Sequence, residues 1–148
     1  MKRICATLAL FAVLLSACSL QANAELTRDL QKWQISNITH YRFDLSVACF
    51  CAFSQRMPLA IEVQNGKVTS MKYNDGTPVI DQEQKMFEQY GTIDALFNFT
   101  RESIAKADEI QVQYDPKYGY PSSVKIDFIK NAVDDELGLT IQSFEPLP

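Results

Sequence analysis

The sequence predicts an α+β domain built on a single antiparallel sheet of about six strands, with two helices packed on one face. Several segments alternate apolar and polar residues with a period of two, as half-buried strands do, and two segments have helical periodicity. The connections between consecutive strands are short, which favours antiparallel pairing. The predicted order is α-β-β-β-α-β-β-β.

The first predicted helix covers residues 25–38. Leu26, Leu30 and Trp33 fall on one stripe of this helix. The first strand follows over residues 41–53, where alternate positions are apolar. These positions are Tyr41, Phe43, Leu45, Val47, Cys49, Cys51 and Phe53.

A hairpin is predicted over residues 59–64 and 67–73, because Asn65-Gly66 is a preferred pair for a two-residue type I′ turn. This turn places Val63 opposite Val68. The polar segment 81–89 is ambiguous. Thr92 is a suitable N-cap for a helix that runs to about Lys106. The last three strands are predicted near residues 109–115, 122–130 and 138–144.

The predicted sheet has one polar face, which would be solvated or would bind a partner. It is expected to display Arg42, Asp44, Glu62, Thr69, Gln111, Gln113, Lys125, Asp127 and Gln142.

The N-terminal segment has the pattern of a bacterial export signal. Lys2 and Arg3 precede an uncharged, mostly apolar stretch over residues 4–15. This stretch is shorter than the roughly 20 residues that span a bilayer. A basic start, a short apolar run and small residues after it are typical of a secretory signal.

Two cleavage sites are compatible with this signal. Residues 15–18 fit the lipobox of bacterial lipoproteins, which would make Cys18 a lipid-anchored first residue, whereas residues 22–24 fit ordinary signal peptidase. We expect the lipobox to be used, because it directly follows the apolar run. The domains are then a signal peptide over 1–18 (alternatively ending at 24), a linker over 19–25, and one domain over 26–148.

The expected location is the periplasmic side of the envelope, with a lipid anchor to the membrane. Ser19 after the cysteine favours the outer membrane if the source is an enteric-type bacterium. Cleavage after residue 24 would instead give a soluble periplasmic or secreted protein.

Charge argues against a nucleic-acid partner. The sequence has 14 Lys and Arg and 18 Asp and Glu, and removal of Lys2 and Arg3 leaves 12 against 18, a net charge of −6. An acidic domain without a basic cluster is a poor nucleic-acid binder. We expect no cofactor, because the chain has no phosphate-binding loop or related motif.

Cys49 and Cys51 remain under either cleavage, and an oxidising compartment favours their pairing. Residues i and i+2 of a regular strand have Cα atoms about 6.5–7 Å apart, near the limit for a disulfide, so the strand must bend or end there. Two other hypotheses are a redox-active pair and a thiolate metal site that includes His40.

Residues 114–121 have strong turn chemistry, with Asp115 and Pro116 followed by Gly119. A rigid hairpin is the main interpretation. The alternative is a ligand-facing loop that offers Tyr114, Asp115, Tyr118 and Tyr120 to a sugar or peptide.

Asp134, Asp135 and Glu136 are weak candidates for a Ca²⁺ site. They lack the alternate spacing and central glycine of an EF-hand loop, so no metal site is predicted. We also predict no catalytic residue.

Several short motifs in a fixed order resemble the bacterial envelope family known as domain of unknown function 6174. The resemblance covers about residues 26–144 and implies no activity. Its motifs are Trp33, Tyr41-Arg42-Phe43, Cys49-Phe50-Cys51, Val63-x-Asn65-Gly66-x-Val68, Leu96-Phe97, Tyr114-Asp115-Pro116-x-x-Gly119-Tyr120-Pro121 and Asp134-Asp135-Glu136.

The sequence therefore predicts an exported lipoprotein domain that is not an enzyme and binds or supports an envelope protein or a small ligand. One alternative is a small thiol/disulfide redox protein that uses Cys49 and Cys51. The other is a Ca²⁺-dependent binding or inhibitor module.

Overall fold

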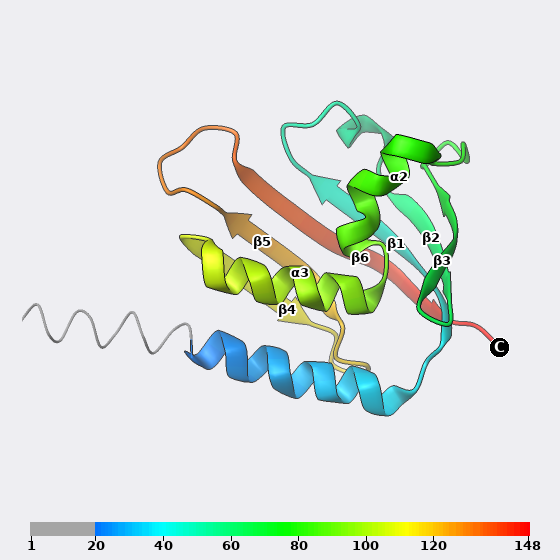
Figure 1. Cartoon of the computed structure of the whole chain (residues 1–148), viewed down its shortest axis with the longest axis horizontal. Coiled ribbons are helices and arrows are strands. Elements are labelled where there is room, and N and C mark those ends of the chain that lie inside the picture. Colours follow the sequence, from blue (N-terminus) through cyan, green and yellow to red (C-terminus); the bar gives the residue numbers. More distant parts are fainter. Residues whose placement is uncertain (1–19) are drawn as a thin grey trace, which may run out of the picture.

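The computed structural model describes residues 20–148 and confirms the predicted α+β class (Figure 1). One six-stranded sheet has the strand order β3-β2-β1-β6-β5-β4, and every neighbouring pair is antiparallel. The first and last strands of the chain therefore pair at the centre of the sheet. The strands are β1 (His40–Ala48), β2 (Leu59–Gln64), β3 (Lys67–Lys72), β4 (Glu109–Tyr114), β5 (Pro121–Asp127) and β6 (Glu136–Pro146).

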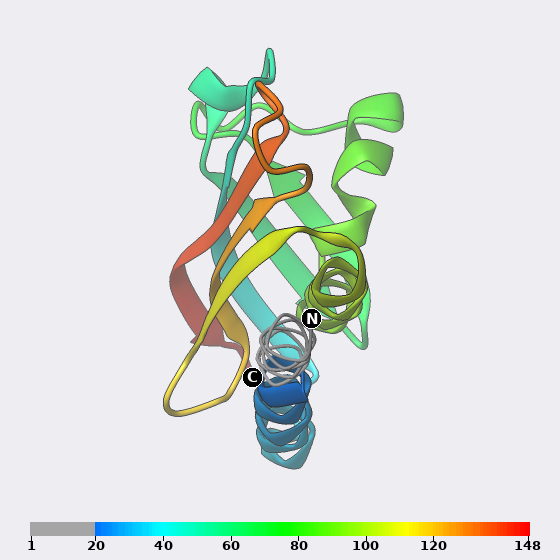
Figure 2. The same ribbon diagram turned by 90° about the vertical axis from the view of Figure 1, so that its left-hand side faces the viewer.

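Two long helices cover the same face of the sheet (Figure 2). They are the N-terminal helix, which includes residues 20–36, and α3 (Ile93–Lys106). The ambiguous segment before α3 forms the short helix α2 (Asp81–Phe87) and a 3₁₀ turn, η2 (Glu88–Tyr90). A further 3₁₀ turn, η1 (Ser54–Arg56), lies between β1 and β2.

The predicted linker is wrong for residues 20–25, which are part of the N-terminal helix. Side-chain bonds one turn apart support this first part of the helix: Gln21 donates to Glu25 (3.1 Å), and the Thr27 hydroxyl donates to the carbonyl of Asn23 (2.8 Å). Residues 1–19, with the predicted signal and lipobox, lie outside the described part of the chain.

The predicted hairpin register is confirmed. Val63 faces Val68, and both turn residues have the positive φ of a type I′ turn, 52° at Asn65 and 74° at Gly66. A one-residue irregularity follows, between Glu62 and Val63.

Three polar contacts fix the start of α3 against its neighbours. The Thr92 hydroxyl caps the helix by accepting from the Ala95 amide (3.0 Å), as predicted. The buried Tyr41 hydroxyl of β1 accepts from the Ile93 amide (3.0 Å). The Trp33 indole of the N-terminal helix donates to Asp94 (3.2 Å). The sheet and both long helices therefore meet at one end of α3.

Candidate functional site

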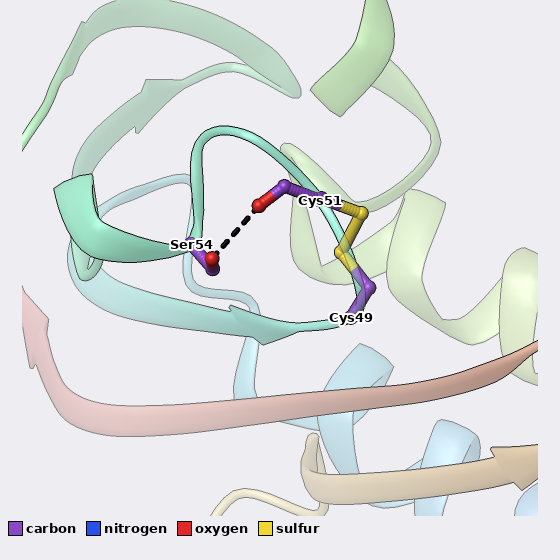
Figure 3. The surroundings of a disulfide bond; sticks show 3 residues. All are labelled: Cys49, Cys51 and Ser54. Atoms are coloured by element: carbon purple, nitrogen blue, oxygen red, sulfur yellow. Dashed lines mark hydrogen bonds between the residues drawn. A yellow bond between two sulfur atoms is a disulfide. The ribbon is translucent and has the colours of Figure 1, made fainter. Parts of the chain in front are cut away.

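Cys49 and Cys51 form a disulfide directly after β1 (Figure 3). The strand ends at Ala48 rather than continuing to residue 53, and the cysteine Cα atoms approach to 5.2 Å. The Cys51 amide donates to the Cys49 carbonyl (2.8 Å), an i to i+2 bond that closes a γ-turn. The bend required for a C-x-C disulfide is thus provided by a tight turn at the end of the strand.

His40 cannot share a metal with this pair, so the hypothesis of a Cys–His metal site is wrong. His40 begins the nine-residue β1, and the cysteines follow the other end. Nine strand residues span roughly 30 Å. The histidine instead has Nδ1 2.8 Å from the Pro148 carbonyl and Nε2 3.2 Å from Glu62. These contacts, the one with Pro148 first, raise the pKa of His40 above its ordinary value of 6.5.

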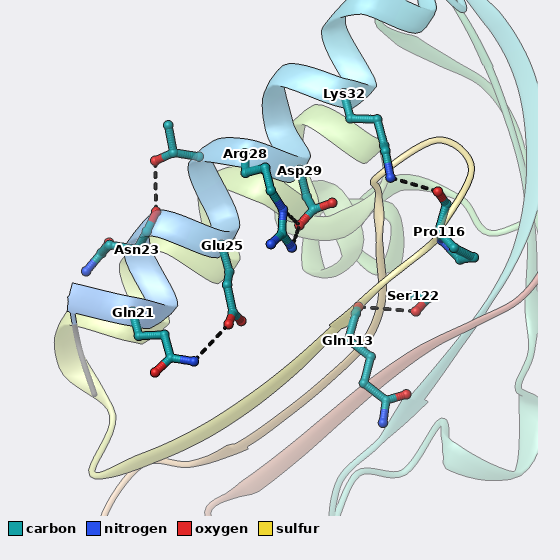
Figure 4. Close-up of polar contacts among 10 residues, drawn as sticks. Gln21, Asn23, Glu25, Arg28, Asp29, Lys32, Gln113, Pro116 and Ser122 are labelled. Carbon is teal, nitrogen blue, oxygen red and sulfur yellow. Dashed lines mark hydrogen bonds and ion pairs between the residues drawn. The ribbon is translucent and has the colours of Figure 1, made fainter. Parts of the chain in front are cut away.

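The loop after β4 holds the N-terminal helix (Figure 4). Lys32 of the helix donates to the Pro116 carbonyl (2.7 Å). Asp115 accepts from the amides of Lys117 (2.9 Å) and Tyr118 (2.6 Å), which closes the turn. A Cβ atom at Gly119 would lie 2.4 Å from the carbonyl oxygen of the helix residue Asp29, so only glycine permits this close approach.

The tyrosines of this loop pack inward, which favours the rigid-hairpin interpretation over the alternative of a ligand-facing loop. The Tyr120 ring lies 4.6 Å from Phe144, and the Tyr118 ring lies 5.5 Å from it. Tyr114 stacks on Phe97 of α3 (6.4 Å). The loop is therefore a rigid hairpin, and the Asp115 carboxylate accepts hydrogen bonds within its turn.

The acidic run before β6 also has a backbone role. Asp135 accepts from the Ile129 amide (2.6 Å), and Asp134 has a positive φ of 69°. Glu136 is the first residue of β6. Within residues 20–148, no group of three or more His, Cys, Asp or Glu side chains is placed to hold a metal ion.

The second face of the sheet is uncovered, as expected, and near its centre its polar side chains pair with one another. Arg42 of β1 bonds to Glu145 of β6 (2.6 Å). Further bonds between the same two strands join Ser143 to Asp44 (2.6 Å) and Gln142 to Ser46 (2.9 Å).

A hollow of about 430 Å³ lies over β4, β5 and β6, close to the end of the sheet that carries the disulfide. Gly138 has no side chain to fill it, and Lys125 and Gln111 occupy the neighbouring positions across the strands. Small-molecule sites begin at about 300 Å³. The hollow is lined by Ala48, Glu109, Gln111, Lys125, Ile126, Asp127, Glu136, Leu137 and Gly138.

Three carboxylates lie side by side along one margin of the hollow. Asp127 of β5 pairs directly with Glu109 of β4 and with Glu136 of β6. Partial burial raises the pKa of Asp127, and the negative charges of Asp135, Glu136, Glu109 and Asp108 raise it further, in that order. Within the described chain, neither Lys125 nor any of these three carboxylates takes part in an ion pair.

Sequence reasoning placed Gln111, Lys125 and Asp127 on this face but did not find the hollow. The sequence feature that could have indicated the hollow is Gly138, the one glycine within the last predicted strand. A missing side chain on a polar face exposes the strand backbone. The carboxylate row could not be read from the sequence, since it depends on the pairing of three strands.

Fold and site together define a small α+β domain with one open sheet face. The chain belongs to the family of unknown function DUF6174, whose model matches residues 25–146 and confirms the resemblance seen in the sequence. Comparisons with curated proteins and with solved structures give no match. Among residues 20–148, no helix has both the length and the apolar character needed to cross a membrane.

Proposed function

We propose that this chain is an exported, lipid-anchored domain of the cell envelope that binds a partner or ligand without catalysing a reaction. The proposed binding site is the hollow over β4, β5 and β6. The observation that supports it most is the contrast within one sheet face. Between β1 and β6, Arg42 and Glu145 form an ion pair and Asp44 accepts from the Ser143 hydroxyl. Around the hollow, no ion pair within the described residues involves Lys125 or the three carboxylates, although Glu109 accepts from the Gln111 amide (3.3 Å).

Unpaired like charges on adjacent strands reduce stability, because directly opposed carboxylates repel each other. Glu109, Asp127 and Glu136 have this arrangement. Functional sites commonly keep groups that lower stability. The site is suited to an occupant with a positively charged group next to the carboxylate row and a hydrogen-bond acceptor next to Lys125.

Site-specific crosslinking in intact cells tests this site. A photoreactive amino acid at Gln111 of the hollow should capture a defined partner, and the same group at Thr69 of the edge strand β3 should not. Gly138→Leu should reduce the capture at position 111, because the new side chain fills the hollow. Equal capture at both positions, or capture unaffected by the leucine, would contradict the proposal.

The export and anchoring part of the proposal is supported by the sequence, namely by the basic start, the apolar stretch over 4–15 and the lipobox ending at Cys18. It places the domain on the periplasmic side of the envelope. Labelled palmitate should be incorporated into the chain and lost in Cys18→Ala. Incorporation that persists in this variant, or none in the natural chain, would contradict it.

Thiol/disulfide exchange is the competing function, and the disulfide beside the exposed Phe50 is the observation that favours it. A Cys49→Ser/Cys51→Ser double variant separates the two functions. The binding proposal expects crosslinking at position 111 to persist in this variant. An exchange activity that disappears with the cysteines while stability is unchanged would favour the redox protein.

A further inference from the structure

We propose that the loop between β5 and β6 contacts the phospholipid surface to which the chain is anchored. The contacting side chains are Ile129 and Val133, with Leu20 at the start of the described helix. This inference rests on the proposed anchoring at Cys18. It adds a second, non-covalent membrane contact and with it a fixed orientation of the domain.

The loop has a defined conformation. Asp135 accepts from the Ile129 amide (2.6 Å), and Asp108 accepts from the Lys130 amide (2.8 Å). The Ala132 amide donates to the Ile129 carbonyl (2.8 Å). Asn131 has a positive φ of 73°, in the left-handed region that asparagine adopts more readily than most residues other than glycine.

This ordered loop directs apolar side chains into solvent. Val133 is 84% exposed and Ile129 is 62% exposed. A single exposed apolar residue needs no explanation. Here two β-branched residues are exposed on one loop whose conformation is fixed by two carboxylates. Surface loops are usually polar, so this pair of exposed apolar side chains calls for an explanation.

The loop lies at the end of the molecule where the N-terminal helix begins. Asp127, the last residue of β5, pairs with Glu109, the first residue of β4. The start of the helix meets the same region of β4, because Gln21 and Ile110 line one shallow pocket. Figure 1 shows both segments at the left of the molecule, with the loop above and the helix start below, and Figure 2 shows the same separation from that side. Leu20, at the start of this helix, is 70% exposed.

The anchor keeps this end close to the lipid. One residue separates Cys18 from Leu20 in the sequence, so their Cα atoms are at most about 7.6 Å apart in any backbone conformation. An acylated Cys18 would therefore place the start of the helix at the membrane surface. Because the loop lies at the same end of the molecule, we infer that the surface it contacts is phospholipid.

Lys130 suits the same surface. It lies between the two apolar residues in sequence, and its long side chain can reach headgroup phosphates while the loop rests on the bilayer. Of the carboxylates near the loop, Asp108 and Asp135 accept bonds from its backbone, whereas Asp134 beside Val133 is exposed. Asp127 and Glu136 border the loop where β5 ends and β6 begins. Two apolar side chains give only weak membrane affinity by themselves. The contact is thus expected only in the anchored chain, where the local lipid concentration is high.

Fluorescence quenching in vesicles tests the contact. The acylated protein is reconstituted into phosphatidylethanolamine/phosphatidylglycerol vesicles that contain a lipid with a quencher on its acyl chain. An environment-sensitive dye is attached through an unnatural amino acid at position 133. The matched control carries the dye at position 67, the first residue of β3, directly after the β2–β3 turn at the opposite end of the sheet. Strong quenching is expected at 133 and little at 67. Ile129→Asn should remove most of the quenching at 133.

A second preparation separates the contact from acylation. Residues 1–18 are replaced by a hexahistidine tag, and the protein is tethered to a nickel-chelating lipid in the same vesicles. If the natural chain proves not to be acylated, the proposed anchoring fails, and quenching at 133 in the tethered form still supports the lipid contact. Equal quenching at 133 and 67, or none at 133, overturns the contact. Shielding of the dye without lipid as protein concentration rises overturns it too, since the loop would then bind a second copy.

Discussion

The charged carboxylate of Asp127 is expected to lower the stability of the fold while it contributes to the proposed binding site. Burial and four neighbouring carboxylates raise its pKa above the ordinary value of 3.8. A folded-state pKa above that of the unfolded chain means that the group stabilises the fold only while protonated. This contribution is complete below about pH 3.8 and is lost as the pH rises through the folded-state pKa.

Asp127→Asn is therefore expected to raise the melting temperature at pH 7, because it removes a carboxylate from between Glu109 and Glu136. The gain should shrink as the pH falls toward 3.8, where the natural residue becomes neutral as well. Melting curves at several pH values measure this. Crosslinking from position 111 should weaken in the same variant. A lower melting temperature at pH 7 would show that Asp127 has a stabilising partner.

Gly119 is a residue that the packing requires. It has a φ of 82°, and an added Cβ would meet the Asp29 carbonyl oxygen of the N-terminal helix at 2.4 Å. Gly119→Ala should destabilise the domain by about 3 kcal/mol or more, because backbone strain and displacement of the helix add. Urea unfolding measures the loss.

Gly76→Ala is the matched control for this substitution. Gly76 has nearly the same φ, 81°, but nothing lies within 4 Å of its added Cβ. Its cost should be limited to the backbone term of about 1 kcal/mol. Equal losses in the two variants would show that the contact with the helix is unimportant.

At the scale of elements, α3 is positioned by its first turn. The cap at Thr92 was predictable because Thr is followed by a helical pattern of apolar residues. The second contact, from the Ile93 amide to the Tyr41 hydroxyl, was not, because it joins residues 52 apart in sequence and depends on the packed sheet. Tyr41 looked from its alternation like an ordinary core residue.

Tyr41→Phe should destabilise the domain by about 1–3 kcal/mol, since it leaves the buried Ile93 amide without an acceptor. Chemical denaturation followed by far-ultraviolet circular dichroism measures the effect. Phe43→Leu on the same strand is a suitable comparison, because it alters core packing without removing a hydrogen bond. No loss in Tyr41→Phe would indicate that another group satisfies the amide.

At the scale of the whole molecule, alternation and turn chemistry were enough to predict the number of strands, their order along the chain and the face that the helices cover. They predicted the ends of β2 correctly but not the ends of every strand. The first strand stops at Ala48 although the alternation continues to Phe53, because the tight turn at the disulfide overrides the pattern. The site is less predictable than the fold, since the hollow exists only where three strands bring their side chains together.

The disulfide is expected to contribute little to global stability. Its ring spans a sequence separation of only two, so it restricts the unfolded chain by about 1.5 kcal/mol at most. The Cys49→Ser/Cys51→Ser variant should unfold cooperatively, with a modest decrease in the free energy of unfolding measured in urea. A loss of several kcal/mol would show that the turn it closes supports the core beyond the loop itself.

The central pairing of β1 with β6 has a consequence for the order of assembly. These strands lie about one hundred residues apart, and β6 separates β1 from the β4–β5 hairpin. Before β6 is in place, β1–β2–β3 and β4–β5 have no backbone pairing with each other, and long-range pairing of this kind forms slowly. A nascent chain would therefore stay unfolded until residues 136–146 have emerged. If the chain is exported as proposed, it would still be unfolded during this delay, and an unfolded polypeptide can pass through a narrow translocation channel.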